Sequence, residues 1–377
     1  MSDGFEHMRI AQGVEQLPEL EWQNLVYGRP ALRLEVLRAI ACHATRPLPL
    51  QIFLLEDQGR LAAAAICEPV AAGSAHNPLD ALLFGRTAGF FRGLRVSTQP
   101  VLVFQTPLMR HSPVVVRSAD AAVQRRLLDR LLDCIEGYAA ALKVGIAFVG
   151  VTPEDEPLWD SLRIRQYLSS EFESTARLEV EWSDFDSYVN HLRQRSRNAA
   201  HNARKERNRN RMCAVDIRQV RCTDADTQAL YRITRDHYRH KNGTDPLYGP
   251  QFLPQLSKAL ADDLLIFEAV RNGERVAMLA VVRSGAVGWV AWIGIELRDR
   301  PNDFTYANIM FYHPADWAPA MGLKTLLYGT GVQQAKAKRG CRLLACHQFY
   351  RPHGKLSRMV AGPYLTIHQA WYRRKGR

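Results

Sequence analysis

The most basic segment of the chain begins at residue 183 and reads SDFDSYVNHLRQRSRNAAHNARKERNRNR. Ser183 or Asp184 can cap a helix here, and apolar or small residues recur behind them at helical spacing. One side of that helix would carry Arg193, Arg197, His201 and Arg204. Like charges four residues apart destabilise a helix unless an anion or water screens them. The helix is therefore either a solvated surface or, as we favour, a phosphate-binding face.

Beyond the basic segment, two side chains could act as a general acid or a general base. The Tyr306 hydroxyl could protonate a leaving group, and His347 could accept a proton near neutral pH. For both residues we favour a structural role in the fold. Cys341, Cys346 and His347 form the one cluster with metal-ligand atoms, but two thiols five residues apart lack the paired spacing of a zinc site. We therefore interpret that segment as a strand and predict no metal.

A predicted hairpin that occurs twice indicates an internal duplication. Residues 50–66 contain two apolar runs around a turn at Gly59, and residues 264–282 contain two apolar runs around a turn at Gly273. The two copies align without gaps between the first run and the glycine. Each would open one half of a duplicated fold.

The remaining pattern predicts a mixed α/β sheet in each half. Further strands are expected at residues 100–104, 113–116, 145–151, 175–180, 288–295, 325–328 and 343–347, and helices at 123–138, 224–240 and 306–321. The later strands alternate with helices, which is typical of α/β layers. We expect an N-terminal domain at residues 1–180 and a C-terminal domain at 181–377, packed around a shared cleft because no flexible linker separates them.

Composition narrows the class of protein. The 377 residues, 47% of them hydrophobic, suit two domains, and no apolar run approaches the ~18 residues of a membrane helix. The polar, acidic N-terminus is unlike a secretory signal, and seven scattered cysteines suit reduced thiols, so the cytoplasm is expected. The net charge of +12 favours a phosphate-bearing or acidic partner: nucleic acid, a cofactor such as coenzyme A, an acidic carrier protein or a nucleotide-linked substrate. Motifs of hydrolases, kinases and dehydrogenases are absent.

Two strings in the second half carry a family resemblance. RQRSRNAAHNARKE, followed by a hairpin and then by YANIMFYHPADWAPAMGLKTLLYGTGVQQAKAKRG, resembles the C-terminal half of the Fem-type aminoacyl-tRNA-dependent transferases and related GNAT-superfamily acyltransferases. The best matches are Ser196-Arg197-Asn198, Arg204-Lys205, and Lys336 placed before Gly340. The N-terminal half resembles the family only in the order of its predicted strands and helices. The resemblance implies tandem GNAT-like domains that transfer an acyl group to an amine, with no metal, resident cofactor or covalent enzyme intermediate.

The acyl donor implied by the resemblance is aminoacyl-tRNA, or a thioester of coenzyme A or of a carrier protein. GNAT domains that use acyl-CoA carry a Q/RxxGxG/A loop that opens a helix and cradles the pyrophosphate. The nearest string here, residues 283–288, lies between two predicted strands and is interpreted as a turn. Aminoacyl-tRNA is therefore favoured, with a small-molecule or peptidoglycan-type amine as acceptor. An RNA-binding module without catalysis is a further alternative.

The resemblance also assigns roles to residues. Lys336 would place a cation near the donor phosphate or the oxyanion, unless it is simply an exposed lysine. Glu296 ends a strand where GNAT enzymes often place a general base, although we favour its interpretation as a surface acid at the end of that strand. The predicted catalytic set is Lys336, Glu296, Tyr306 and His347; the predicted donor-binding set is Arg193, Arg197, Asn198, His201, Arg204 and Lys205.

Overall fold

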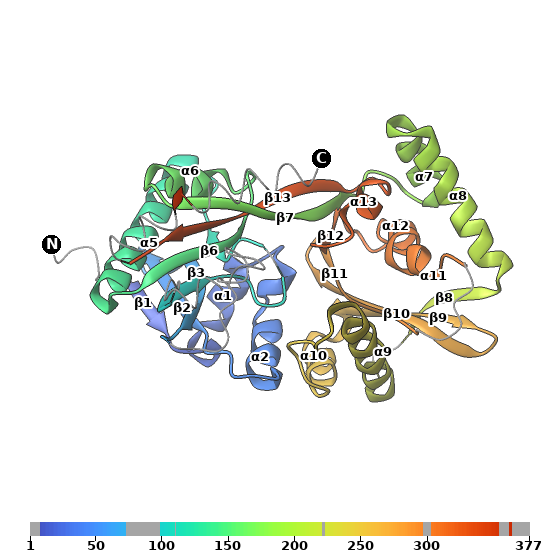
Figure 1. The fold of residues 1–377 in the computed structure, drawn as a ribbon, viewed down its shortest axis with the longest axis horizontal. Coiled ribbons are helices and arrows are strands. Elements are labelled where there is room, and N and C mark those ends of the chain that lie inside the picture. The colour runs from blue at the N-terminus through green and yellow to red at the C-terminus, as the bar shows by residue number, and fades with distance from the viewer. Residues whose placement is uncertain are drawn as a thin grey trace. The chain divides into compact units, whose positions relative to one another are not determined.

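The computed structural model describes residues 8–72, 99–109, 111–220, 223–296, 303–353 and 362–363. It confirms the mixed α/β class (Figure 1). The chain divides into two compact units, which interleave along the sequence. Among the described residues, unit 1 draws on the ranges up to 25, 48–174 and from 344 onward, whereas unit 2 comprises 26–47 and 175–343. No helix in these ranges is long and apolar enough to cross a membrane.

This division differs from two contiguous halves at 1–180 and 181–377. The change at residues 174 and 175 lies near the expected boundary, but residues 26–47 join unit 2 and most of the last strand joins unit 1. Long-range ion pairs explain the first exchange. The Arg33 guanidinium lies 2.6 Å from the carboxylate of Asp263, which Arg283 also contacts at 2.8 Å. Contacts between residues this far apart in the chain leave no local pattern.

The sheet of unit 1 runs in the order β1-β2-β3-β4-β6-β13, with β5 paired to β3. Its strands are β1 (Met8–Ala11), β2 (Gln51–Asp57), β3 (Arg60–Val70), β4 (Val101–Phe104), β5 (Val114–Val116), β6 (Gly145–Val151) and β13 (Arg342–Arg351). Strands β4 and β6 pair in parallel. Helices α1 (Glu19–Leu25), α5 (Ala121–Leu142) and α6 (Glu156–Ile164) accompany it. The Asp120 carboxylate caps α5 by accepting from the N–H groups of Ala122 and Val123.

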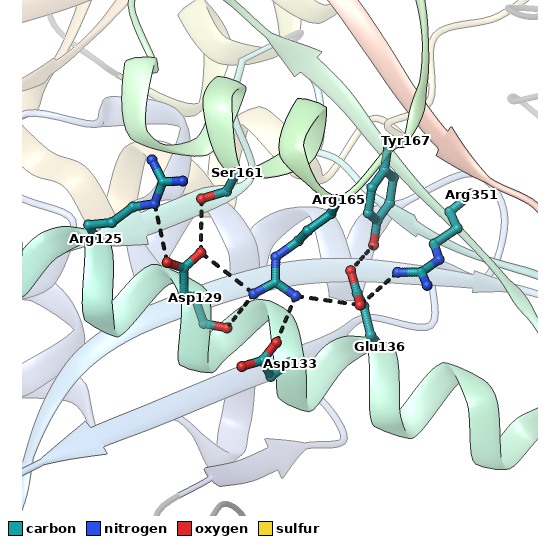
Figure 2. A network of polar contacts seen from close by, with 8 residues as sticks. All are labelled: Arg125, Asp129, Asp133, Glu136, Ser161, Arg165, Tyr167 and Arg351. Atoms are coloured by element: carbon teal, nitrogen blue, oxygen red, sulfur yellow. Dashed lines mark hydrogen bonds and ion pairs between the residues drawn. The ribbon is translucent and has the colours of Figure 1, made fainter.

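A polar network ties the last strand into unit 1 (Figure 2). Glu136 of α5 accepts from the Tyr167 hydroxyl and lies 2.6 Å from the Arg351 guanidinium of β13. Arg165, at the end of α6, contacts Glu136 and also Asp133. Helix α5 therefore holds both α6 and β13. This network and the antiparallel pairing with β6 place the last strand in unit 1.

The sheet of unit 2 runs in the order β7-β12-β11-β10-β9-β8. Its strands are β7 (Leu168–Glu179, in unit 2 from Thr175), β8 (Val215–Val220), β9 (Leu264–Arg271), β10 (Glu274–Ser284), β11 (Val287–Ile295) and β12 (Thr325–Gly329). Its helices are α2 (Leu34–His43), α7 (Phe185–Arg195), α8 (Arg197–Met212), α9 (Asp224–Asn242), α10 (Phe252–Leu260), α11 (Thr305–Ala307), η5 (Asn308–Tyr312), α12 (His313–Trp317) and α13 (Gln333–Ala337). Helices α9 and α10 lie on one face of strands β9–β11, and α11 and α12 lie on the other (Figure 1).

The duplicated hairpin is confirmed in its turns. In the β2–β3 turn, Gln58 and Gly59 have φ of 53° and 72°; in the β9–β10 turn, Asn272 and Gly273 have φ of 52° and 80°. Two consecutive left-handed residues between antiparallel strands form the tight turn whose twist matches the strands. The glycine is favoured at the second position because it has no side chain to clash there.

The basic segment forms two helices where one was expected. Ser196 has extended backbone angles, with φ −159° and ψ 118°, so it ends α7 and begins α8. Its hydroxyl accepts from the Ala199 N–H, which is an N-cap contact that competes with helix continuation. The expected helix at residues 306–321 is also divided, into α11, the π-helical turn η5 and α12. Strands β1 and β8 and helices α1, α2, α6, α10 and α13 were not predicted.

Candidate active site and basic face

Strands β11 and β12 separate at their carboxyl ends. Their parallel pairing is limited to residues 287–289 of β11 and 325–327 of β12, whereas β11 continues to Ile295. Ligands of open α/β sheets bind at the carboxyl ends of parallel strands, where loops can present side chains and backbone groups. This end of unit 2 is therefore the candidate active site.

Lys336 organises the turn that follows β12. Its ammonium donates to the carbonyl oxygens of Tyr328 at 2.8 Å, Gly329 at 3.0 Å and Thr330 at 2.9 Å. The residue is only 1% exposed, so it is not the surface lysine that the KAKR string suggested. Its three N–H bonds are directed at the protein backbone. In this structure Lys336 therefore fixes the turn and does not present its charge directly to a phosphate.

Tyr306 and helix α9 border the same region. The Tyr306 ring lies nearly parallel to the His237 imidazole, with centroids 6.4 Å apart. One helical turn later on α9, the Lys241 ammonium lies 3.8 Å from the position that a Cβ at Gly331 would take. Burial raises the pKa of the Tyr306 phenol, so the hydroxyl keeps its proton at neutral pH. A protonated phenol can donate to a leaving oxygen.

The other two predicted catalytic residues have different surroundings. Glu296 directly follows β11, and its carboxylate lies 2.8 Å from the Arg232 guanidinium of α9. His347 lies on the part of β13 that belongs to unit 1, where its ring packs edge-on against Trp159 at 4.5 Å. Three of the four predicted residues thus belong to unit 2, with Lys336 and Glu296 following β12 and β11.

The predicted donor-binding residues are exposed on α7 and α8. We call the exposed basic residues of these two helices the basic face: Arg193, Arg195, Arg197, His201, Arg204, Lys205, Arg209 and Arg211. Asn198 is exposed beside them. Arg204 lies 3.9 Å from Asp186, and both side chains are well exposed, so this contact neutralises the face only weakly.

Helix α8 packs on unit 2 through the residues between the exposed ones. Arg207 lies 2.5 Å from the Asp316 carboxylate and 3.8 Å from the centre of the Phe185 ring. The Asn210 amide donates to the Asp303 carbonyl at 3.0 Å. Glu206, the one acid of α8, contacts Arg339 and Tyr312. Its charge is therefore directed away from the basic face.

Sequence reasoning missed Arg339, Tyr312, His237 and Lys241. Arg339 stands three residues after Lys336, and that spacing is the one signal that could have drawn attention to it. The others become relevant only through contacts across the fold. The strand predicted at residues 343–347 is confirmed by β13. Cys341 directly precedes it, and burial raises the pKa of the Cys341 thiol to about 12. Within the described ranges, no three metal-ligating side chains gather.

Comparison with known proteins agrees with this architecture. FemX has a TM-score of 0.60 at 10% identity, covering 94% of this chain and 100% of that one. The C-terminal domain of a putative lysylphosphatidylglycerol synthetase from Agrobacterium fabrum has a TM-score of 0.54 at 10% identity, with coverages of 93% and 95%. L-PGS from Bacillus licheniformis has a TM-score of 0.50 at 12% identity, with coverages of 82% and 86%. These similarities establish a GNAT-like, Fem-type fold. A search of curated protein sequences gave no match.

The family model and the GNAT-like fold together define the class of protein, an acyltransferase. Residues 100–371 match the model of the FemAB-like family, described as peptidoglycan biosynthesis/recognition. The chain belongs to this family, because the match spans well over half of it.

Proposed function

We propose that the protein forms an amide bond by moving an aminoacyl group from aminoacyl-tRNA to the amine of a small-molecule or peptidoglycan-type acceptor. The basic face is the observation that carries this proposal. Eight basic side chains are exposed along two consecutive helices, and the acid of α8 faces the protein interior. A row of cations at this spacing suits the phosphates of a nucleic acid backbone.

The family and its relatives support the acceptor and donor classes. The family description names peptidoglycan biosynthesis, and peptidoglycan precursors contain amines that can accept an acyl group. The Agrobacterium structure is named for a putative lysylphosphatidylglycerol synthetase, and FemX carries the Fem name. We carry these substrate classes to this chain as part of the proposal.

The chemistry requires few side chains. The acceptor amine attacks the ester carbonyl, an N–C bond forms, and the C–O bond to the tRNA ribose breaks. The amine loses a proton and the ribose oxygen gains one. We assign Tyr306 as the donor of the proton that the ribose oxygen gains, and Glu296 as the carboxylate that accepts the amine proton. Lys336 holds the turn beside the reacting groups. We assign His347 no step.

Donor binding can be tested with bulk tRNA charged with a mixture of radiolabelled amino acids. We expect the wild-type protein to retain this probe on a filter, with affinity that falls steeply as salt rises. Replacing both Arg197 and Arg204 with alanine should weaken binding and lower the salt slope by about one for each lost phosphate contact. Arg163→Ala, an exposed arginine on α6, is the matched control. Equal affinity of the double variant and the wild type would refute the assignment.

The thioester donors are separated from tRNA by a second experiment. Purified protein is used to capture partners from cell extract with and without RNase, followed by RNA sequencing and mass spectrometry. Recovery of tRNA that RNase abolishes supports the proposal. Recovery of a phosphopantetheine carrier protein or of coenzyme A without tRNA would reassign the donor. The string at residues 283–288 forms the turn between β10 and β11 and opens no helix, which argues against coenzyme A at that position.

A further inference from the structure

Glu206 is the one acidic residue of α8, and it points into unit 2. Its Oε2 atom accepts from the Arg339 guanidinium at 2.7 Å and from the Tyr312 hydroxyl at 2.5 Å. The side chains of Glu206 and Arg339 are only 16% and 14% exposed. The Arg339 guanidinium also lies over the Phe311 and Tyr312 rings. A charge pair enclosed in this way resists screening by salt and holds its two helical segments in one arrangement.

Arg339 belongs to the same short segment as Lys336. The Arg339 guanidinium donates to the Ala335 carbonyl at 3.0 Å, so its side chain braces the last turn of α13. The Arg339 carbonyl accepts from the Tyr188 hydroxyl at 2.9 Å, and the Gly340 carbonyl accepts from Arg195 at 2.8 Å. Helices α7 and α8 therefore hold the segment 335–340 at three points.

Direct contacts then continue to the candidate active site. Lys336 donates to the backbone carbonyls of residues 328–330, which form the turn at the carboxyl end of β12. A continuous series of contacts thus connects α8 to the turn. It passes through Arg339, the segment 335–340 and Lys336. Each step is a hydrogen bond, an ion pair or a covalent connection within that segment.

We propose that Glu206 is a positioning residue, which through Arg339 fixes the Lys336 segment and thereby couples the basic face to the turn beside β12. The proposal rests on the proposed function, since it makes donor binding on α8 stabilise the site where the acyl group reacts. Glu206 touches no substrate. Its contribution is to keep Lys336 and the 328–330 turn in place when α8 binds the donor.

The ion pair of the next residue along α8, Arg207, supplies a matched control. Arg207 of α8 forms a second, partly buried ion pair, at 2.5 Å from Asp316, with side chains 18% and 34% exposed. That pair ties α8 to α12 rather than to residues 335–340. Glu206→Gln and Asp316→Asn each remove one carboxylate charge and leave one partly buried arginine unpaired. Their general effects on stability should be similar, whereas their effects on residues 328–340 should differ.

The test is amide hydrogen exchange measured by mass spectrometry on the full chain without ligand. We expect Glu206→Gln to speed exchange in peptides covering residues 328–340 by about tenfold or more, while Asp316→Asn leaves them near wild type. Tyr312→Phe, which removes one donor to Glu206 and keeps the ion pair, should give a smaller change in the same peptides. It also preserves the test if Glu206→Gln does not fold. Similar exchange in all variants, or faster exchange spread evenly over unit 2, would overturn the proposal.

A double variant, and a second exchange experiment with tRNA added, distinguish a positioning role of Glu206 from a purely structural role. Glu206→Gln with Arg339→Gln removes both charges and should recover part of the protection that either single change loses. Bulk aminoacyl-tRNA should slow amide hydrogen exchange of residues 328–340 in the wild type and in Asp316→Asn. Glu206→Gln should bind the probe with similar affinity but show little of this protection. Failure of the wild type to bind refutes the proposed function, whereas binding with equal protection in Glu206→Gln refutes the positioning role alone.

Discussion

The carboxylate of Glu136 lies 2.6 Å from the guanidinium of Arg351, so a residue of helix α5 holds a residue of the last strand (Figure 2). Tyr167 and Arg165 contact the same carboxylate. Burial raises the pKa of the Tyr167 phenol, which keeps the hydroxyl protonated and able to donate to Glu136. The contact closes unit 1 with a strand that arrives only after the chain has built unit 2.

Glu136→Gln should loosen this closure. Since Arg351 is 40% exposed, we expect a loss of only about 1 kcal/mol in the free energy of unfolding, together with faster proteolysis near the C-terminus. Asp133→Asn, whose carboxylate is 67% exposed, should have a smaller effect. Urea denaturation and limited proteolysis measure both. Equal resistance of Glu136→Gln and wild type to protease would contradict the anchoring role.

Lys336→Met should disorder the turn beside β12. The carbonyls of residues 328–330 lose their donor, and an unsatisfied buried polar group costs about 1–3 kcal/mol. We expect a lower unfolding temperature and loss of transferase activity. Lys338→Met, two residues later on an exposed position, is the control and should match wild type in both measurements. An unchanged unfolding temperature in Lys336→Met would count against the three bonds.

His313 should make unit 2 less stable in mild acid. Burial lowers the pKa of its imidazole to about 4, against the ordinary value of 6.5. Between these values the unfolded chain binds a proton and the native chain does not, so stability is full above pH 6.5 and falls as the pH drops toward 4. The loss would reach up to about 3 kcal/mol, at 1.36 kcal/mol per pKa unit.

Urea midpoints measured from pH 7.5 to 5 test this expectation. The wild type should lose more stability over that range than His313→Gln, which has no imidazole to titrate. His240→Gln removes an exposed imidazole and should keep the wild-type pH dependence. Parallel pH profiles for wild type and His313→Gln would show that another group controls acid sensitivity.

Gly294→Ala should separate α9 from β11. A Cβ at this position would lie 2.6 Å from the backbone of Ile233 and Thr234, and a backbone cannot rotate away as a side chain can. We expect a loss of about 1–3 kcal/mol in unfolding free energy. At Gly249 the nearest atom would be 3.4 Å away, so Gly249→Ala is a suitable control. Wild-type stability of Gly294→Ala would mean that α9 can shift without cost.

The sequence by itself determined the features that are local in the chain. The tight turns at Gly59 and Gly273 follow from turn residues between apolar runs, and the duplicated hairpin follows from their repetition. The exposed arginines of α7 and α8 could be predicted because charged side chains at helical spacing rarely face a core. Strand and helix types were predictable for the same reason, since periodicity records which side of an element is buried.

The tertiary structure decided what depends on partners distant in the chain. One exception is local: Ser196 divides the basic segment because its hydroxyl caps α8, and the helical spacing of the neighbouring residues does not reveal this. Lys336 looked exposed among lysines and arginines, yet the carbonyls after β12 bury its ammonium. The last strand joins unit 1 through β6 and Glu136. Burial and pairing of these groups are set by the packing of segments far apart in sequence, where local periodicity carries no information.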